Sequence, residues 1–341
     1  MFIYTKKLLL LLALFATLFT SSVTQVQAAT NDTVTVYSSR KEHLIQPLFE
    51  QFTKETGVEV NYLTGKGSDL IERLKLEGEK TPADMFMTVD AGDLWYAGTQ
   101  NIFQSVSSDI LNSNIPSHLR DPGGLWTGLS VRARTIVYST DRVNPNELST
   151  YAELANAKWS GRLCLRTSKK IYTKSLVASI IHNQGNENAK QIVTGWVSNL
   201  AAVPNAKDSH IMNAIIAGQC DVGIVNTYYF GRLIEENPEA PLKLYWANQN
   251  STGVHVNVSG AGVTKYSSNV EGSIQLLEWL SSARAQSIYA SLNKEYPANQ
   301  NIASDEIVSS WGSFKQDKMN LSIAGKLQSE AVTLMQRQGY K

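Results

Sequence analysis

The sequence lacks the short motifs that identify the common classes of enzyme. No Gly-x-Ser-x-Gly elbow, His-Glu-x-x-His motif, Walker loop or Gly-x-Gly-x-x-Gly fingerprint occurs in its 341 residues. The five histidines are scattered, and none stands in a recognisable motif: His43, His118, His182, His210 and His255. An enzyme is therefore a disfavoured reading, because the sequence names no nucleophile and no acid–base pair.

An excess of charge of one sign is also missing. The chain has 31 Lys plus Arg against 30 Asp plus Glu, which gives a formal net charge of +1. This balance excludes a strongly basic nucleic-acid-binding protein. Long apolar runs are absent beyond the N-terminal segment, and this argues against an integral membrane protein.

The N-terminus has the pattern of a secretory signal peptide. Lys6 and Lys7 precede an apolar run at Leu8–Phe19, and Val26–Ala28 supplies the small residues of a cleavage site. The apolar run is shorter than the ~20 residues that a membrane anchor needs. We therefore predict that residues 1–28 are a signal peptide and that the rest of the chain is exported.

Cysteine is scarce as well. Cys164 and Cys220 are the only two cysteines, and both lie in the exported part. In an oxidising compartment an even pair is more often bridged than free. Each cysteine stands beside a strand-like run, so we predict a disulfide between neighbouring strands, with two buried free thiols as the alternative. A zinc site is not expected, because no further His or Cys ligands cluster with them.

Strand-like and helix-like segments alternate after the signal peptide. Val34–Ser38, Val58–Tyr62 and Met85–Val89 have the pattern of strands, and Leu44–Glu55 carries the apolar stripe of a helix. This order is typical of an α/β lobe with a mainly parallel sheet. Ligands of such sheets gather at the carboxyl ends of the strands.

A second α/β set follows a long alternating run at Leu129–Tyr138. It extends from Gly161 to about Tyr245, and Gly260–Val263 then leads back toward helical sequence. We therefore predict two lobes joined by two long strands. The predicted boundaries are 29–129 plus about 258–309 for the N-lobe, and 130–257 plus about 310–341 for the C-lobe.

The unusual feature of the sequence is a pair of tyrosines, Tyr228 and Tyr229, directly after the apolar run Val222–Val225. Adjacent side chains of a strand point to opposite faces, so both phenols reach one ligand only if the backbone leaves the strand at Thr227. A phenol has a pKa of ~10, but a highly charged cation displaces its proton, and hard oxygen ligands suit Fe³⁺. Taken alone, such a pair is more often a packing element.

Three segments together resemble the periplasmic ferric-ion-binding proteins, which are the substrate-binding subunits of bacterial iron ABC transporters. These segments are Val36–Lys41, Lys80–Asp84 and Val225–Arg232, and the resemblance extends over nearly the whole exported chain. It implies a two-lobed periplasmic-binding-protein fold, with a mainly parallel sheet and flanking helices in each lobe. It also implies a periplasmic, monomeric, non-enzymatic protein that captures Fe³⁺ in an interlobe cleft and delivers it to a membrane permease and its ATPase.

The resemblance also implies which residues hold the iron. The adjacent tyrosines of the family match Tyr228 and Tyr229, and a third tyrosine found in some members matches Tyr172. Tyr172 and Tyr228 each lie eight residues beyond a cysteine. A Cys164–Cys220 bridge is therefore expected to bring both tyrosines to one rim of the sheet.

An arginine of the family holds a synergistic anion such as carbonate, and it matches Arg132, with Arg134 as a weaker candidate. The hydroxyl groups of Thr167 and Ser168 are further candidates for this anion site. Three phenolates would neutralise Fe³⁺, and Arg132 would offset the anion.

The chain also departs from some relatives. It carries Lys41 where they have a His or Tyr ligand, and Asp90 is better explained as a helix cap than as a ligand. These departures favour the subgroup that uses tyrosines from one lobe plus an anion. Two alternatives stay open: the same fold binding a small organic anion or a polyamine, and an exported hydrolase.

Overall fold

The computed structural model describes residues 33–341, so the signal peptide predicted at 1–28 lies outside the described residues. The strands of this part are β1 (Thr33–Ser38), β2 (Glu59–Thr64), β3 (Met85–Thr88), β4 (Thr127–Ser139), β5 (Leu163–Cys164), β6 (Val222–Asn226), β7 (Leu242–Tyr245), β8 (Val256–Val263) and β9 (Tyr296–Pro297). Its α-helices are α1 (Gln46–Thr56), α2 (Gly67–Glu77), α3 (Ala91–Thr99), α4 (Asp109–Asn114), α5 (Ile171–Gln184), α6 (Asn186–Ser198), α7 (Asp208–Ile216), α8 (Thr227–Glu236), α9 (Val270–Ser281), α10 (Ala283–Asn293), α11 (Glu306–Ser309), α12 (Leu321–Lys326) and α13 (Gln328–Arg337). No helix within residues 33–341 combines the length and the apolar character that a membrane crossing requires.

The first lobe is built on β1, which lies between β2 and β3 and pairs with both in parallel. The alternation of β1 sends Val34 and Val36 to one face of the sheet and Tyr37 to the other. The two valines pack in a buried cluster with Phe49 of α1, whereas Tyr37 packs in a second cluster with Leu70 of α2. Both faces are therefore covered by helices, as expected for parallel strands.

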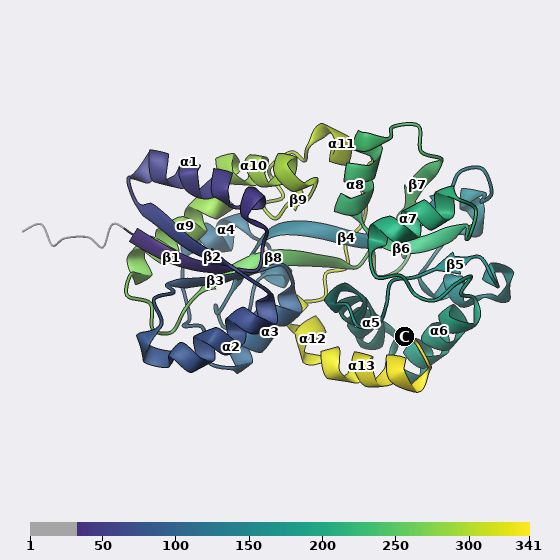
Figure 1. Cartoon of the computed structure of the whole chain (residues 1–341), viewed down its shortest axis with the longest axis horizontal. Helices are drawn as coiled ribbons and strands as arrows, with labels where there is room; N and C mark the ends of the chain where they lie inside the picture. The colour runs from purple at the N-terminus through teal and green to yellow at the C-terminus, as the bar shows by residue number, and fades with distance from the viewer. Residues whose placement is uncertain (1–32) are drawn as a thin grey trace, which may run out of the picture. The chain divides into compact units, whose positions relative to one another are not determined.

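Two long strands, β4 and β8, run side by side across the middle of the described chain (Figure 1). They pair antiparallel, with Arg132 opposite Asn257, and every residue of both strands is buried. β8 also pairs with β3, and the far end of β4 pairs with β6 and β7. The pair thus carries the sheet from one lobe into the other, and the predicted hinge strands are confirmed.

The sheet is mixed, because the hinge strands run antiparallel to their neighbours. Among the strands of residues 33–341, parallel pairing joins β1 to β2, β1 to β3 and β5 to β6. The two-lobed α/β fold is confirmed, and the description "mainly parallel" applies to the first lobe alone. The residue boundaries of the lobes remain a prediction, since β4 and β8 contribute to both.

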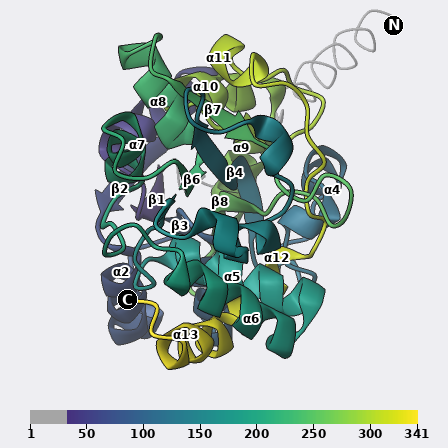
Figure 2. The same cartoon turned by 90° about the vertical axis from the view of Figure 1, so that its right-hand side faces the viewer.

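The second lobe packs around β5 and β6, with α5, α6 and α13 in mutual contact on one side of it (Figure 2). Its core contains the fully buried Trp159 and Trp196. A disulfide joins Cys164, at the end of β5, to Cys220, which lies two residues before β6. The two strands pair in parallel, with Cys164 opposite Gly223. The predicted bridge between neighbouring strands is therefore confirmed.

Candidate metal centre

Tyr228 and Tyr229 lie on the first turn of α8. β6 ends at Asn226 and α8 begins at Thr227, so the backbone leaves the strand where the sequence predicts. The two rings then lie close together on the helix, with their centroids 4.4 Å apart and their planes tilted by 36°. Tyr228 is buried and Tyr229 is half-buried. The strand-to-helix change is what allows two adjacent phenols to face the same region.

Tyr172 reaches the same place from the first turn of α5. It lines the same cavity as Tyr228 and Tyr229, and the Tyr228 phenol accepts a hydrogen bond from Asn226 Nδ2 at 3.4 Å. The structure therefore brings together the three tyrosines that the sequence selects: Tyr172, Tyr228 and Tyr229. Their role as iron ligands remains a prediction.

Burial favours the protonated form of Tyr172 and Tyr228 in the metal-free protein. It raises the pKa of Tyr172, and the Arg132 guanidinium opposes that rise. Burial also raises the pKa of Tyr228 well above its usual value, and the neighbouring Tyr172 and Tyr229 add to the shift. A cation that binds here must therefore displace protons, so its affinity falls as the pH falls.

A cavity of about 200 Å³ opens next to the three phenols. The second lobe contributes the tyrosines and Arg232 to its wall, and Arg132 of the hinge strand β4 lies between the lobes. On the opposite side the wall is formed by residues that follow β1 and β3, by residues at and after the end of α10, and by Ser259 of β8. These opposing residues are Ser39, Arg40, Lys41, Leu44, Val89, Ser259, Asn293 and Glu295.

Three arginines surround the phenol rings. The Cζ atom of Arg166 lies 5.2 Å from the ring centroid of Tyr172 and 5.7 Å from that of Tyr229. Arg132 Cζ lies 5.2 Å from the Tyr172 centroid, and Arg232 Cζ lies 5.4 Å from the Tyr228 centroid. Positive charge at these positions favours phenolate over phenol.

The carboxylates near the site do not neutralise all of these cations. Asp208 is shared by two guanidinium groups, because Oδ1 accepts from Arg166 Nη1 and Oδ2 accepts from Arg134 Nη1, each at 3.0 Å. Arg232 donates to Asn293 and has no carboxylate partner in the part of the chain that the structure describes. The surroundings of the phenols therefore carry a surplus of positive charge, which suits an anionic ligand set.

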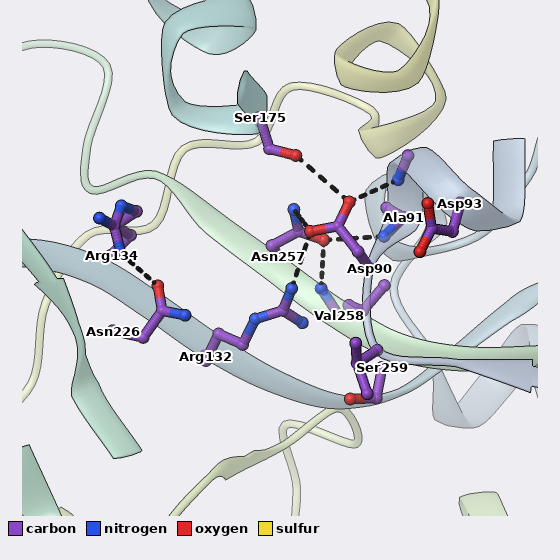
Figure 3. Close-up of polar contacts among 12 residues, drawn as sticks. Asp90, Ala91, Asp93, Arg132, Arg134, Ser175, Asn226, Asn257, Val258 and Ser259 are labelled. Atoms are coloured by element: carbon purple, nitrogen blue, oxygen red, sulfur yellow. Dashed lines mark hydrogen bonds and ion pairs between the residues drawn. The ribbon is translucent and has the colours of Figure 1, made fainter. Parts of the chain in front are cut away.

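Arg132 forms a buried ion pair with Asp90, at 3.0 Å between Nη2 and Oδ2 (Figure 3). Asp90 also caps α3 by accepting from Gly92 N, so the predicted helix cap is confirmed. Arg134 lies two residues from Arg132 and hence on the same face of β4. The two arginines differ in the carboxylate that each meets, since Arg134 pairs with Asp208 in the second lobe.

Thr167 and Ser168 do not line this cavity. They lie in the loop before α5, where their backbone N–H groups donate to Asn205 O and Lys341 O. Their role in holding an anion stays an untested prediction. Lys41, by contrast, lies in the cavity wall at the position where some relatives were expected to carry a ligand.

Sequence reasoning missed Arg166 and Arg232. Arg232 was detectable, because a helix that begins at Thr227 places it three and four residues after the tyrosines, on one helical face. Arg166 was not, because its position depends on Asp208, which lies 42 residues further along the chain.

Comparisons with known proteins agree with the two-lobed fold. Residues 37–287 match the family model of the bacterial extracellular solute-binding proteins. Iron uptake protein A1 of Synechocystis sp. is 41% identical over 314 residues, which cover 90% of this chain and 87% of that protein. The solved structure of FutA (IdiA) of Trichodesmium in complex with iron and citrate has a TM-score of 0.88 and 44% identity, over 91% of this chain and all of that chain. Ferric iron-binding protein A of Mannheimia haemolytica in an open conformation has a TM-score of 0.85 and 34% identity, over 90% and 98% of the two chains.

Proposed function

Since the chain belongs to the bacterial extracellular solute-binding protein family, we propose that it captures Fe³⁺ between its lobes through the phenolates of Tyr172, Tyr228 and Tyr229. The observation that carries this proposal is the meeting of three phenols from two helices beside one cavity. Phenolate oxygens are hard ligands and suit a hard trivalent cation. The names of the relatives, an iron uptake protein and a ferric iron-binding protein, support the same cargo.

A synergistic anion completes the proposed site. Three phenolates would neutralise Fe³⁺, so the positive charge of Arg232 and Lys41 in the cavity wall is left to offset an anion. The opposing wall carries Lys41 rather than a carboxylate or imidazole ligand at the end of β1. A carboxylate anion would fill the remaining coordination positions of the iron and would meet these cations. Citrate bound with iron in the Trichodesmium structure is an anion of this class.

The proposed role in the cell is delivery rather than chemistry. The chain would be exported to the periplasm as a monomer and would hand its iron to an inner-membrane permease driven by an ATPase. The membership of the solute-binding family and the two lobes joined by β4 and β8 support this role. Lobe rotation about such a hinge is a common way to enclose a ligand.

Titration of the purified exported chain with ferric citrate tests the proposal. We expect a visible phenolate-to-iron charge-transfer band, and iron binding that weakens as the pH falls. Tyr228→Phe should weaken binding by more than the roughly 10–100-fold that loss of an outer-shell partner costs. Tyr96→Phe is the matched control, because Tyr96 is exposed on α3 and does not line the cavity.

The alternative ligand, a small organic anion or a polyamine, predicts a different outcome. An organic ligand that stacks on the aromatic rings would tolerate Tyr228→Phe, because the ring itself is retained. A protein that gives no visible band with ferric citrate or ferric bicarbonate, and that binds no iron by elemental analysis, would contradict the iron proposal.

A further inference from the structure

Asp90 lies where the two lobes and both hinge strands meet. Its carboxylate accepts four hydrogen bonds, two at each oxygen (Figure 3). Oδ1 accepts from Gly92 N at 2.8 Å and from Ser175 Oγ at 3.2 Å. Oδ2 accepts from Arg132 Nη2 and from Asn257 Nδ2, each at 3.0 Å. Helix capping requires only the bond from Gly92 N, so it does not explain the other three hydrogen bonds of Asp90.

Two of the hydrogen bonds to Asp90 hold Arg132 of β4 and Asn257 of the neighbouring strand β8. Arg132 of β4 lies opposite Asn257 of β8, and Asp90 binds both side chains. Asn257 Oδ1 in turn accepts from Ala91 N at 3.0 Å, so the start of α3 is tied to the hinge. Asp90 therefore holds the place where the hinge strands pair.

The bond to Asp90 occupies only one of the two terminal nitrogens of the Arg132 guanidinium. Nη2 is occupied by Asp90, whereas Nη1 is buried and has no hydrogen-bond partner among residues 33–341. Figure 3 shows that this second nitrogen is directed away from Asp90. Arg132 lines the cavity, and its guanidinium lies beside the Tyr172 ring. A buried donor without a partner is costly unless a ligand meets it.

The remaining bond crosses between the lobes. Ser175 lies on α5, three residues beyond Tyr172, and α5 packs in the core of the second lobe. Asp90 follows β3 of the first lobe. The Ser175–Asp90 bond thus connects the helix that carries one tyrosine to the carboxylate that holds Arg132.

We propose that Asp90 is a positioning residue that couples anion binding to lobe contact. It holds Arg132 with Nη1 free for the anion, and it accepts Ser175 from the opposite lobe. The proposal rests on the proposed function, because it assigns a partner to the anion that accompanies Fe³⁺. The ligand class is a carboxylate or carbonate oxygen, which a guanidinium N–H binds as a charge-assisted hydrogen bond.

Asp90→Asn separates this role from helix capping. Asparagine is as good an N-cap as aspartate and has nearly the same shape. It removes the negative charge, however, and leaves Arg132 without its ion pair. Ser175→Ala is a milder variant that removes only the bond between the lobes. Ser179→Ala is its matched control, because Ser179 lies one turn further along α5, is also buried and bonds to a different carboxylate, that of Asp317.

The experiment measures the citrate concentration that gives half of the maximal iron–phenolate band at fixed ferric iron. We expect Asp90→Asn to raise this concentration about 10–100-fold, the usual effect of losing an outer-shell partner. Ser175→Ala should raise it about tenfold, the effect of losing a hydrogen bond to a charged group. Ser179→Ala should leave it unchanged, and saturating citrate should restore the wild-type band in every variant because the tyrosines are intact.

The outcomes separate this proposal from the proposed function. A wild-type protein without an iron–phenolate band contradicts the proposed function itself. A wild-type band combined with unchanged half-saturating citrate in both Asp90→Asn and Ser175→Ala overturns the role of Asp90. Weaker iron binding by the same factor at every citrate concentration also overturns it, because a merely structural role of Asp90 predicts that result. Ser175→Ala keeps the test decisive if Asp90→Asn does not fold.

Discussion

Opening the Cys164–Cys220 disulfide is expected to weaken the second lobe in a way that can be calculated. β5 has only two residues, and it pairs with β6 at two positions, Leu163 with Val222 and Cys164 with Gly223. So short a strand has little hydrogen bonding of its own, and the bridge is the covalent link that holds it beside β6. Both cysteines are buried, so reduction of the bridge leaves two thiols in an apolar environment.

The magnitude follows from the 56 residues that separate the two cysteines. A loop of this length gives a chain-entropy contribution of about 4 kcal/mol at 25 °C. This is a large part of the 5–15 kcal/mol that stabilises typical domains. Unfolding entropies of about 2 cal/mol/K per residue convert the loss into a Tm lower by roughly 6 °C for a chain of this size.

Thermal unfolding followed by circular dichroism, with and without a reductant, measures this change. The double variant Cys164→Ala with Cys220→Ala serves as a control for incomplete reduction. The bridge also connects the strands that lead to Tyr172 and Tyr228, so iron affinity should fall together with Tm. A Tm change below about 1 °C would refute the entropy estimate. A lower Tm with unchanged iron affinity would refute the idea that the bridge positions the tyrosines.

Two further predictions concern Asp93, which is largely buried, and Asp208, which is fully buried. Burial and the nearby Asp90 raise the pKa of Asp93 to about 7, so the folded protein loses stability as the pH rises from the unfolded pKa near 4 through 7. The free energy of unfolding of Asp93→Asn should therefore equal that of the wild type at pH 4 and be roughly 3–4 kcal/mol higher at pH 8. Parallel pH profiles of the two unfolding free energies would contradict this. Asp208→Asn leaves Arg134 and Arg166 buried without their carboxylate, so chemical denaturation should show a loss of roughly 3–5 kcal/mol, and a loss below 1 kcal/mol would contradict the calculation.

Local patterns predicted the parts of the fold that depend on local physics. Apolar alternation identified the strands of the first lobe and the long hinge strand β4. A strand that is buried on one or both faces needs apolar residues at regular positions, and this local pattern is visible in the sequence. The change from strand to helix at Thr227 followed from the need to bring two adjacent phenols to one place. The disulfide followed from an even cysteine count in a chain that the sequence predicts to be exported.

The polar network around the site could not be predicted from the sequence, because the residues that pair in it are distant along the chain. Arg132 and Arg134 lie on the same face of β4, and nothing local shows that one meets Asp90 and the other Asp208. These pairs span 42 and 74 residues respectively. The strand direction in the second lobe was unpredictable for the same reason, since it depends on which edge of the sheet the hinge strand meets.

The placement of the tyrosines suggests that, under the proposed function, binding of the iron and closure of the lobes depend on different groups. Tyr172, Tyr228 and Tyr229 all come from α5 and α8 of the second lobe, and they line one cavity. Under the proposed function, the second lobe therefore presents its metal ligands without any contribution from the first. The opposing wall offers hydroxyl and cationic groups that would interact with an anion rather than with Fe³⁺, and its one carboxylate, Glu295, is already paired with Arg40. Closure would then depend on the anion, which is the only part of the ligand that both lobes can hold.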